Sequence, residues 1–343
     1  MIASLKPILD ILGAPHVQYR IPVFQRVYSW NRQQCNQLWA DMMEAAAVGN
    51  DHFMGTLISL PESSPHADAN QDNVRPADLI DGQQRLTTIT LVLIALRDEL
   101  RSLGDDRRAR EIDETYLHAA PGVCKLELSR ADAPTLAHLI DGTELSPDLE
   151  PSQFLIDNLN AFRAMIGQEP DDIDKVLRGL GCLQVVAIEL GEDDAPQQVF
   201  ESLNAKGRPL STTDLLRNTL LTKYGTHEQE RLFETYWTPL DEAFQQFGPE
   251  QDIYLDAALH AWAAKAAPSI HAAKRSDLYQ AFKSYLMRQQ GASLEELEDM
   301  LRSISTECLA FAANPDGTDA RRHLDWATEK PEGMISKRKL FGD

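Results

Sequence analysis

Five consecutive residues, Asp81-Gly82-Gln83-Gln84-Arg85, are the best suited to chemistry in this sequence. A short apolar run ends at the aspartate, and the residues after the arginine place leucine and isoleucine at helical spacing. The pattern predicts a strand, a glycine turn and a helix start, which points free backbone N–H groups at an anion. Arg85 adds a forked, permanently charged donor suited to phosphate, and Asp81 would hold a cation or orient a water. We therefore expect a turn that handles phosphate.

A structural corner is the alternative for this turn, because strand–glycine–helix junctions are common and a short motif is weak by itself. On that interpretation, Gln83 and Gln84 are solvated residues of the first helical turn. The choice depends on polar residues elsewhere in the chain.

One further polar cluster stands at residues 21–30, with the sequence Ile-Pro-Val-Phe-Gln-Arg-Val-Tyr-Ser-Trp. Its Gln25 and Arg26 have no role in a core, although a surface salt bridge remains an alternative for Arg26. Its aromatic residues have core packing as their alternative. Another polar cluster, in one loop, is aimed at an anion or a base and consists of Asn204, Lys206 and Arg208.

Composition indicates a soluble globular protein of about two domains, with 343 residues, 43% hydrophobic and 25% charged residues. The formal net charge of −20 argues against coating nucleic acid by bulk charge but allows a local basic groove. No apolar run reaches eighteen residues and the first residues are too polar for a signal peptide, so we expect a cytoplasmic protein without a membrane span. Four widely spaced cysteines indicate buried thiols rather than a disulfide or zinc set.

The fold class expected is α+β: a small mixed sheet with helices over residues 1–225, followed by an all-α domain over 226–343. An opening helix is expected at 5–11, and Gly55 is expected to allow close backbone approach within a strand. The strands are expected at 17–23, 53–60, 74–80, 123–128 and 182–190. One helix is expected to begin at a cap at Ser29 or Asn31, and another at a cap at Ser211. The other helices are expected at 86–117, 133–140, 154–166, 232–247, 253–266, 278–288 and 294–312.

Motifs of several enzyme classes are missing from the sequence: H-E-x-x-H, an HNH-like histidine cluster, a P-loop and G-x-S-x-G. A metal-dependent nuclease or a serine hydrolase within this chain is therefore not expected. Any enzymatic chemistry must come from Asp, Gln, Arg and Asn around a bound cation. Such a site suits phosphoryl transfer to water, which needs positioning and charge neutralisation more than a nucleophile.

Three motifs in order, at 21–30, 80–88 and 204–218, resemble the N-terminal domain family of GmrSD-type, modification-dependent restriction proteins, which includes SspE-like sensors of phosphorothioated DNA. The resemblance implies a ParB/sulfiredoxin-like core and Mg²⁺-dependent nucleoside triphosphate hydrolysis coupled to recognition of modified double-stranded DNA. In such proteins an HNH-type nuclease domain usually cuts. This chain would then be the sensor and NTPase part, with the nuclease at its C-terminus or in a separate subunit, and a homo-oligomer is possible.

The resemblance also implies roles for individual residues. The catalytic residues would be Asp81, Gln83, Gln84 and Arg85, with Asp81 as the Mg²⁺ ligand. The nucleotide-binding residues would be Gln25, Arg26, Gly82, Thr87, Asn204, Lys206 and Arg208.

The modification sensor is expected at Tyr28 and Trp30 beside Arg26. A phosphorothioate sulfur is softer and less hydrated than oxygen, so an aromatic wall next to an arginine would favour it. A glucosylated base would need a wide, hydrogen-bonding pocket instead. We expect the DNA-binding face near Arg26 and near four cations of the helical domain, Lys274, Arg275, Lys283 and Arg288.

Other functions stay open at this point. One is a nucleotide-gated DNA clamp of ParB type that does not hydrolyse, and another is the glucosylated-base sensor of a two-subunit restriction enzyme. A toxin-like or nuclease subunit would need a histidine–metal cluster, which the sequence does not contain. A helical scaffold without chemistry is the remaining alternative.

Overall fold

The computed structural model describes residues 1–61, 74–129, 132–143, 150–167, 172–191, 194, 199, 211–222, 224–270, 272, 274–288 and 293–328. Two compact units make up the chain, Met1–Leu203 and Asn204–Asp343. A mixed sheet with helices followed by a helical region confirms the predicted fold class. The ParB/sulfiredoxin-like core stays a prediction. So does the functional division at residues 225 and 226, which compactness does not test.

A mixed six-stranded sheet forms the base of the N-terminal unit. Its order is β1 (Ile2–Pro7), β8 (Leu183–Glu189), β3 (His52–Pro61), β4 (Arg75–Asp81), β2 (Val17–Arg20) and β7 (Leu126–Glu127). The β1–β8 and β3–β4 pairs are antiparallel, and the other three are parallel. Because Ile58 of β3 faces Asp81 of β4 in the register, the last residue of β4 lies beside a central strand.

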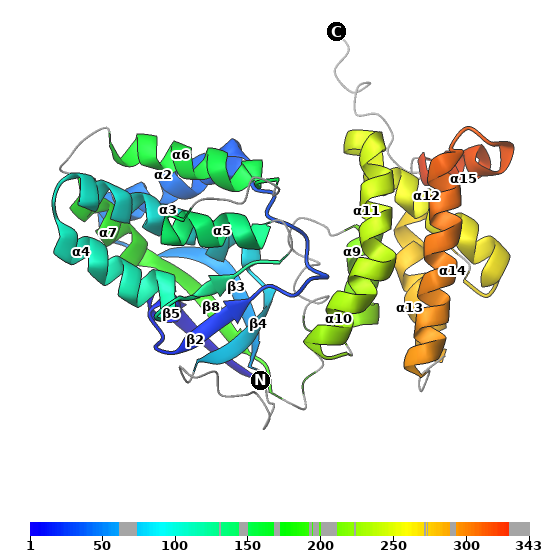
Figure 1. Cartoon of the computed structure of the whole chain (residues 1–343), viewed down its shortest axis with the longest axis horizontal. Coiled ribbons are helices and arrows are strands. Elements are labelled where there is room, and N and C mark those ends of the chain that lie inside the picture. Colours follow the sequence, from blue (N-terminus) through cyan, green and yellow to red (C-terminus); the bar gives the residue numbers. More distant parts are fainter. Residues whose placement is uncertain are drawn as a thin grey trace, which may run out of the picture. The chain divides into compact units, whose positions relative to one another are not determined.

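Helices follow the strands in the N-terminal unit. They are α1 (Ile8–Leu12), α2 (Arg32–Val48), α3 (Gln83–Ser102), α4 (Asp106–Ile112), the π-helical turn η1 (Asp113–Leu117), α5 (Asp132–Asp141), α6 (Gln153–Ile166) and α7 (Asp172–Cys182). Figure 1 shows α2, α3, α6 and α7 together on one side of the sheet. A two-stranded sheet of β5 (His118–Ala120) and β6 (Val123–Cys124) follows η1 directly.

Helix α3 is the centre of this unit. Fifteen of its residues are buried, as expected for a helix that is apolar around most of its circumference. Its leucines and isoleucines belong to one hydrophobic core shared with α1, α2, α6, α7 and the strands. A helix held on all sides is a rigid base for the turn at its N-terminus.

The start of the chain differs from the prediction. Residues 5–7 belong to β1, and helix begins only at Ile8, so the opening helix predicted at 5–11 is wrong in its first half. Antiparallel pairing with β8, some 180 residues away in the chain, overrides the local helical spacing of the apolar residues. Of the two predicted caps for the next helix, Asn31 is the one observed, in a capping box with Gln34.

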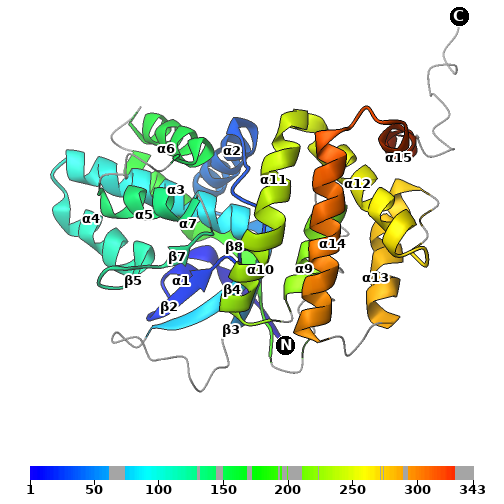
Figure 2. The same ribbon diagram turned by 45° about the vertical axis from the view of Figure 1, so that its right-hand side comes forward.

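The C-terminal unit is helical. Its elements are α9 (Thr212–Leu221), α10 (Thr226–Leu232), η2 (Phe233–Trp237), α11 (Thr238–Phe244), η3 (Gln245–Glu250), α12 (Gln251–Ala266), η4 (Arg275–Asp277), α13 (Leu278–Arg288), α14 (Leu294–Ala313) and α15 (Thr318–Thr328). Ser211 caps α9 as predicted, accepting a hydrogen bond from the N–H of Asp214. Helix α9 packs on α12 and α13, and Figure 2 shows α11 and α14 side by side. None of the helices in the described ranges combines the length and apolar composition that a bilayer span needs.

Candidate functional site

The predicted strand–glycine–helix turn is present between β4 and α3. Gly82 has a φ of +94°, and a Cβ on it would lie 3.1 Å from the carbonyl oxygen of Thr56 and 3.3 Å from Cα of Leu57. Both features require glycine. Helix α3 begins at the next residue without a side-chain cap. No capping oxygen therefore accepts from the first N–H groups of the helix, and the positive end of the helix dipole is not compensated by such an oxygen.

Asp81 and Arg85 form an ion pair across the turn. Nη2 of Arg85 lies 3.4 Å from Oδ2 of Asp81, and Oγ1 of Thr56 donates to the same oxygen at 3.0 Å. Each of the two charged side chains is 22% exposed. Burial lowers the pKa of Arg85, and the charge of Asp81 partly offsets this. The guanidinium nevertheless stays charged because its ordinary pKa is so high.

Gly55 of β3 makes room for that guanidinium. Nη1 of Arg85 donates to the carbonyl oxygen of Met54 at 2.7 Å, and a Cβ on Gly55 would stand 2.0 Å from the same Nη1. This confirms the close approach predicted for Gly55. The contacts of Met54 and Thr56 were missed at the sequence level, because nothing in the local pattern of β3 indicates which strand lies beside the turn.

Gln83 and Gln84 are buried rather than solvated, with 7% of each residue exposed, so the solvated alternative is wrong. Nε2 of Gln84 donates to the carbonyl oxygen of Val27 at 3.2 Å, and its Oε1 accepts from the N–H of Ser29 at 2.8 Å. Nε2 of Gln83 donates to the carbonyl oxygen of Arg26 at 3.2 Å. The two glutamines therefore hold the backbone of residues 26–29.

Gln25 completes the connection in the other direction. Its Nε2 donates to the carbonyl oxygen of Ile80 at 3.0 Å, and 5% of the residue is exposed. Residues 21–30 contain no helix or strand, so their backbone polar groups need partners of another kind. Glutamine side chains supply several of them, and the two sequence motifs are thereby joined into one structure.

The four predicted catalytic residues thus differ in whether their polar atoms are available to a ligand. Both ends of the Gln84 amide are occupied by backbone, which makes it a positioning residue. Oε1 of Gln83 is buried and has no hydrogen-bond partner among the described residues, which is unusual for a buried oxygen. Asp81 and Arg85 are charged and partly exposed. The turn therefore offers a carboxylate, a guanidinium and an amide oxygen.

The predicted nucleotide-binding residues are only partly assembled around this turn. Gly82 and Gln25 belong to it, and Arg26 is half-buried next to it. Thr87 is 1% exposed and lies on the core side of α3. The remaining three, Asn204, Lys206 and Arg208, lie outside the described residues.

Tyr28 lies in the core, as the alternative for the aromatic residues allowed. It is 4% exposed, and its hydroxyl lies 2.8 Å from Oγ1 of Thr88 and 3.2 Å from Nδ2 of Asn158. Burial raises the pKa of Tyr28 well above its ordinary range. Trp30 is half-buried, and its carbonyl oxygen accepts from Asn158 at 2.7 Å. The sensing role of both aromatics stays a prediction.

Two of the four cations predicted to bind DNA from the C-terminal unit, Arg275 and Arg288, make contacts within it. Nε of Arg275 lies 2.6 Å from Oδ2 of Asp256, and burial raises the pKa of that carboxyl to about 6 despite the arginine. Arg288 makes a long contact, 3.5 Å, with the carbonyl oxygen of Ser269. A DNA-binding role for these two, Lys274 and Lys283 stays a prediction.

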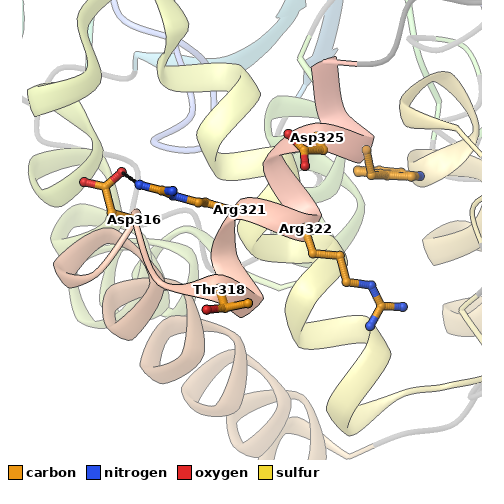
Figure 3. A pocket seen from close by; sticks show the side chains of 6 residues that line it. Asp316, Thr318, Arg321, Arg322 and Asp325 are labelled. Atoms are coloured by element: carbon orange, nitrogen blue, oxygen red, sulfur yellow. Dashed lines mark hydrogen bonds and ion pairs between the residues drawn. The ribbon is translucent and has the colours of Figure 1, made fainter.

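Two hollows lie away from the turn. One, of about 530 Å³, is lined by residues of β1, β2, β3, β4 and β8 together with α1. The other, of about 490 Å³, lies along α15. Figure 3 shows that Arg322 points away from the pair formed there by Asp316 and Arg321, which are 3.3 Å apart. Mixed charges line this second hollow, so it favours neither anions nor cations.

Comparison with models of protein families identifies the N-terminal part of the chain. Residues 8–221 match the family model described as the GmrSD restriction endonuclease, N-terminal domain. The match includes the β4–α3 turn, the 21–30 segment and α9. A search of curated proteins finds no significant match.

Proposed function

Because the chain belongs to the family of GmrSD restriction endonuclease N-terminal domains, we propose that its β4–α3 turn hydrolyses nucleoside triphosphates to control DNA cleavage. Family membership makes the chain a component of a restriction system that acts on modified DNA, together with a partner or fused nuclease domain. One observation carries the proposal: the uncapped N-terminus of α3 is flanked by the partly exposed Asp81–Arg85 pair.

The charges at this turn suit a triphosphate. A helix N-terminus attracts anions, and a cation placed there is unfavourable without one. Arg85 is such a cation, and Asp81 is its only side-chain partner among the described residues. Phosphate oxygens would therefore find both the helix N–H groups and a forked donor.

Mg²⁺ fits the oxygen atoms that the turn provides. Both described contacts of Asp81 fall on Oδ2, which leaves Oδ1 for a cation, and Oε1 of Gln83 is an unpaired oxygen nearby in sequence. Mg²⁺ usually takes one or two protein oxygens along with substrate phosphates. When bound, it would neutralise charge on the phosphates.

The DNA signal that we propose is a phosphorothioate. The 21–30 segment carries the predicted sensor residues, and the side chains of three glutamines link this segment to the nucleotide turn. A change at one motif therefore displaces hydrogen-bond partners of the other. Half-buried Trp30 and Arg26 supply the aromatic surface and the cation that a soft anion prefers.

The second candidate is a nucleotide-gated clamp without hydrolysis. Its support is Gln84, whose Nε2 donates to Val27 and whose Oε1 accepts from Ser29, so that the amide holds backbone rather than orienting a water. In that case the nucleotide would order the 26–29 backbone, and no phosphate would be released.

The test is phosphate release from a panel of nucleoside triphosphates, without DNA, with plain DNA, and with phosphorothioated or glucosylated DNA. Wild type is compared with Arg85→Ala and with Arg107→Ala, a control whose side chain is 80% exposed. We expect release that is stimulated by phosphorothioated DNA, retained in the control and reduced about 10²–10³-fold in Arg85→Ala. If the nucleotide binds but no phosphate is released under any condition, the proposed hydrolysis is wrong and the protein is a nucleotide-gated clamp.

A further inference from the structure

A cluster of three potential metal ligands lies at the β5–β6 hairpin. It consists of His118, Cys124 and Asp141, whose ligand atoms all lie within 4.8 Å of one another. His118 and Cys124 face each other in the antiparallel register of β5 and β6, and Asp141 is the last residue of α5. None of the three takes part in the nucleotide turn.

The hydrogen bonds of His118 determine which of its nitrogens is available. Nδ1 lies 3.1 Å from the carbonyl oxygen of Asp113, and a carbonyl oxygen only accepts, so Nδ1 carries a hydrogen. Nε2 lies 3.0 Å from Oδ1 of Asp141. With a hydrogen on Nδ1, the lone pair of Nε2 is the one available to a metal ion, and it lies beside a carboxylate oxygen that is itself a possible metal ligand.

A metal-binding histidine characteristically has this arrangement. Its second nitrogen donates to a carbonyl or a carboxylate, which fixes the tautomer and the ring orientation. Here the carbonyl oxygen of Asp113 also accepts the backbone N–H of His118, so it fixes both the ring and the main chain.

Arg97 of α3 holds the supports of the cluster in place. It is 2% exposed, and its Nη1 donates to Oδ1 of Asp113 at 2.9 Å and to the carbonyl oxygen of Ile140 at 2.5 Å. One buried guanidinium therefore joins the residue that orients His118 to the end of α5, which carries Asp141. The site is built on rigid elements rather than on a loose surface.

Cys124 supplies a soft ligand of restricted exposure. Its carbonyl oxygen accepts from Nε2 of Gln18 at 3.2 Å, which anchors the backbone. Burial, with smaller effects of Asp141 and Glu127, raises the pKa of Cys124 to about 11. Zinc binds cysteine as the thiolate, so metal binding at Cys124 must displace the thiol proton to solvent.

We propose that His118, Cys124 and Asp141 form a zinc site with three protein ligands and a fourth position open to water. Nitrogen, thiolate and carboxylate together suit Zn²⁺, whereas Mg²⁺ prefers oxygen alone. Tetrahedral zinc bonds of about 2.0–2.3 Å place ligand atoms roughly 3.3–3.5 Å apart. Side-chain exposures of 21% for His118 and 38% for Asp141 leave a solvent approach to the fourth position.

Cobalt substitution tests the site in the full chain. After chelator treatment, Co²⁺ is titrated and the thiolate-to-cobalt charge-transfer absorption is recorded, and Zn²⁺ affinity is measured by competition with a chromophoric chelator. We expect one equivalent to bind with a charge-transfer band. Zinc added afterwards should abolish the band.

Variants assign the ligands. Cys124→Ser should remove the band, and both Cys124→Ser and His118→Gln should weaken zinc binding about 100-fold or more. Cys182→Ser is the matched control, because Cys182 is also a half-buried free cysteine, and it should behave like wild type. X-ray absorption of the wild-type zinc form needs no variant and should show one sulfur neighbour at about 2.3 Å. A spectrum with only nitrogen and oxygen, or undiminished binding in Cys124→Ser, would overturn the proposal.

Discussion

Replacing Gly55 by alanine should displace Arg85 from the nucleotide turn. The new Cβ would stand 2.0 Å from Nη1 and 3.2 Å from Cζ of Arg85, and the shorter of these distances is too close for any non-bonded contact. The guanidinium would have to leave the carbonyl oxygen of Met54 and the carboxylate of Asp81. Gly55→Ala should therefore have the functional defect of Arg85→Ala although Arg85 is still present.

The magnitude has two parts. Gly55 has a φ of +108°, and an alanine in a left-handed conformation costs about 1–2 kcal/mol. Loss of a hydrogen bond from a charged donor adds about 1.5–3 kcal/mol. The total is about 3–4 kcal/mol, since Arg85 is partly exposed and water would satisfy some of its displaced donors.

Gly104→Ala separates these two parts. Gly104 has a φ of +79° and no heavy atom within 4 Å of the position of its Cβ, so it carries the backbone cost alone. Urea unfolding should show a loss of about 1–2 kcal/mol for Gly104→Ala and about twice that for Gly55→Ala. Phosphate release should fall only in Gly55→Ala. Equal stability of the two variants, together with wild-type release from Gly55→Ala, would refute the role assigned to this contact.

Two other predictions concern buried polar groups. Gln84→Ala should lower the free energy of unfolding by about 2–3 kcal/mol, because it leaves the carbonyl oxygen of Val27 and the N–H of Ser29 unpaired. Urea unfolding measures this loss, with Gln37→Ala at an exposed site as the control. Equal stability of the two variants would contradict the prediction. Asp256 has a folded-state pKa of about 6 against about 3.9 unfolded, so wild type binds a stabilising proton that it loses as the pH rises through 6. The stability of wild type relative to Asp256→Asn should thus fall by about 2 kcal/mol between pH 4 and pH 7, whereas a rise would mean that pairing with Arg275 outweighs burial.

Elements with a strong local pattern were predictable from the sequence. The strands at 52–61, 75–81 and 183–189 and the helices at 153–166 and 294–313 lie within a few residues of their predicted positions. Other elements, α7 among them, were not. β1 depends on pairing with β8, and α15 buries only Ala320, His323 and Ala327, which is too weak an apolar stripe to indicate a helix.

The candidate site was predictable in its backbone but not in its side-chain contacts. A carboxylate, a glycine and a helical pattern suffice to predict the turn, because each has a local conformational preference. The roles of Gln25, Gln83 and Gln84 depend on partners more than fifty residues away in the chain. Local spacing contains no information about such partners, so the glutamines resembled catalytic groups when most of their bonds serve to hold backbone.

The family match and the compact units have different limits, with a practical consequence for anyone who dissects this protein. The match ends at residue 221, whereas α9, which ends there, packs on α12 and α13 of the C-terminal unit. An expression fragment cut at the family boundary would present Leu216, Leu220 and Leu221 to solvent, all of them buried in the intact chain. Such a fragment should aggregate through this helix. Chimaeras between family members should therefore exchange α9 together with the helices that cover it.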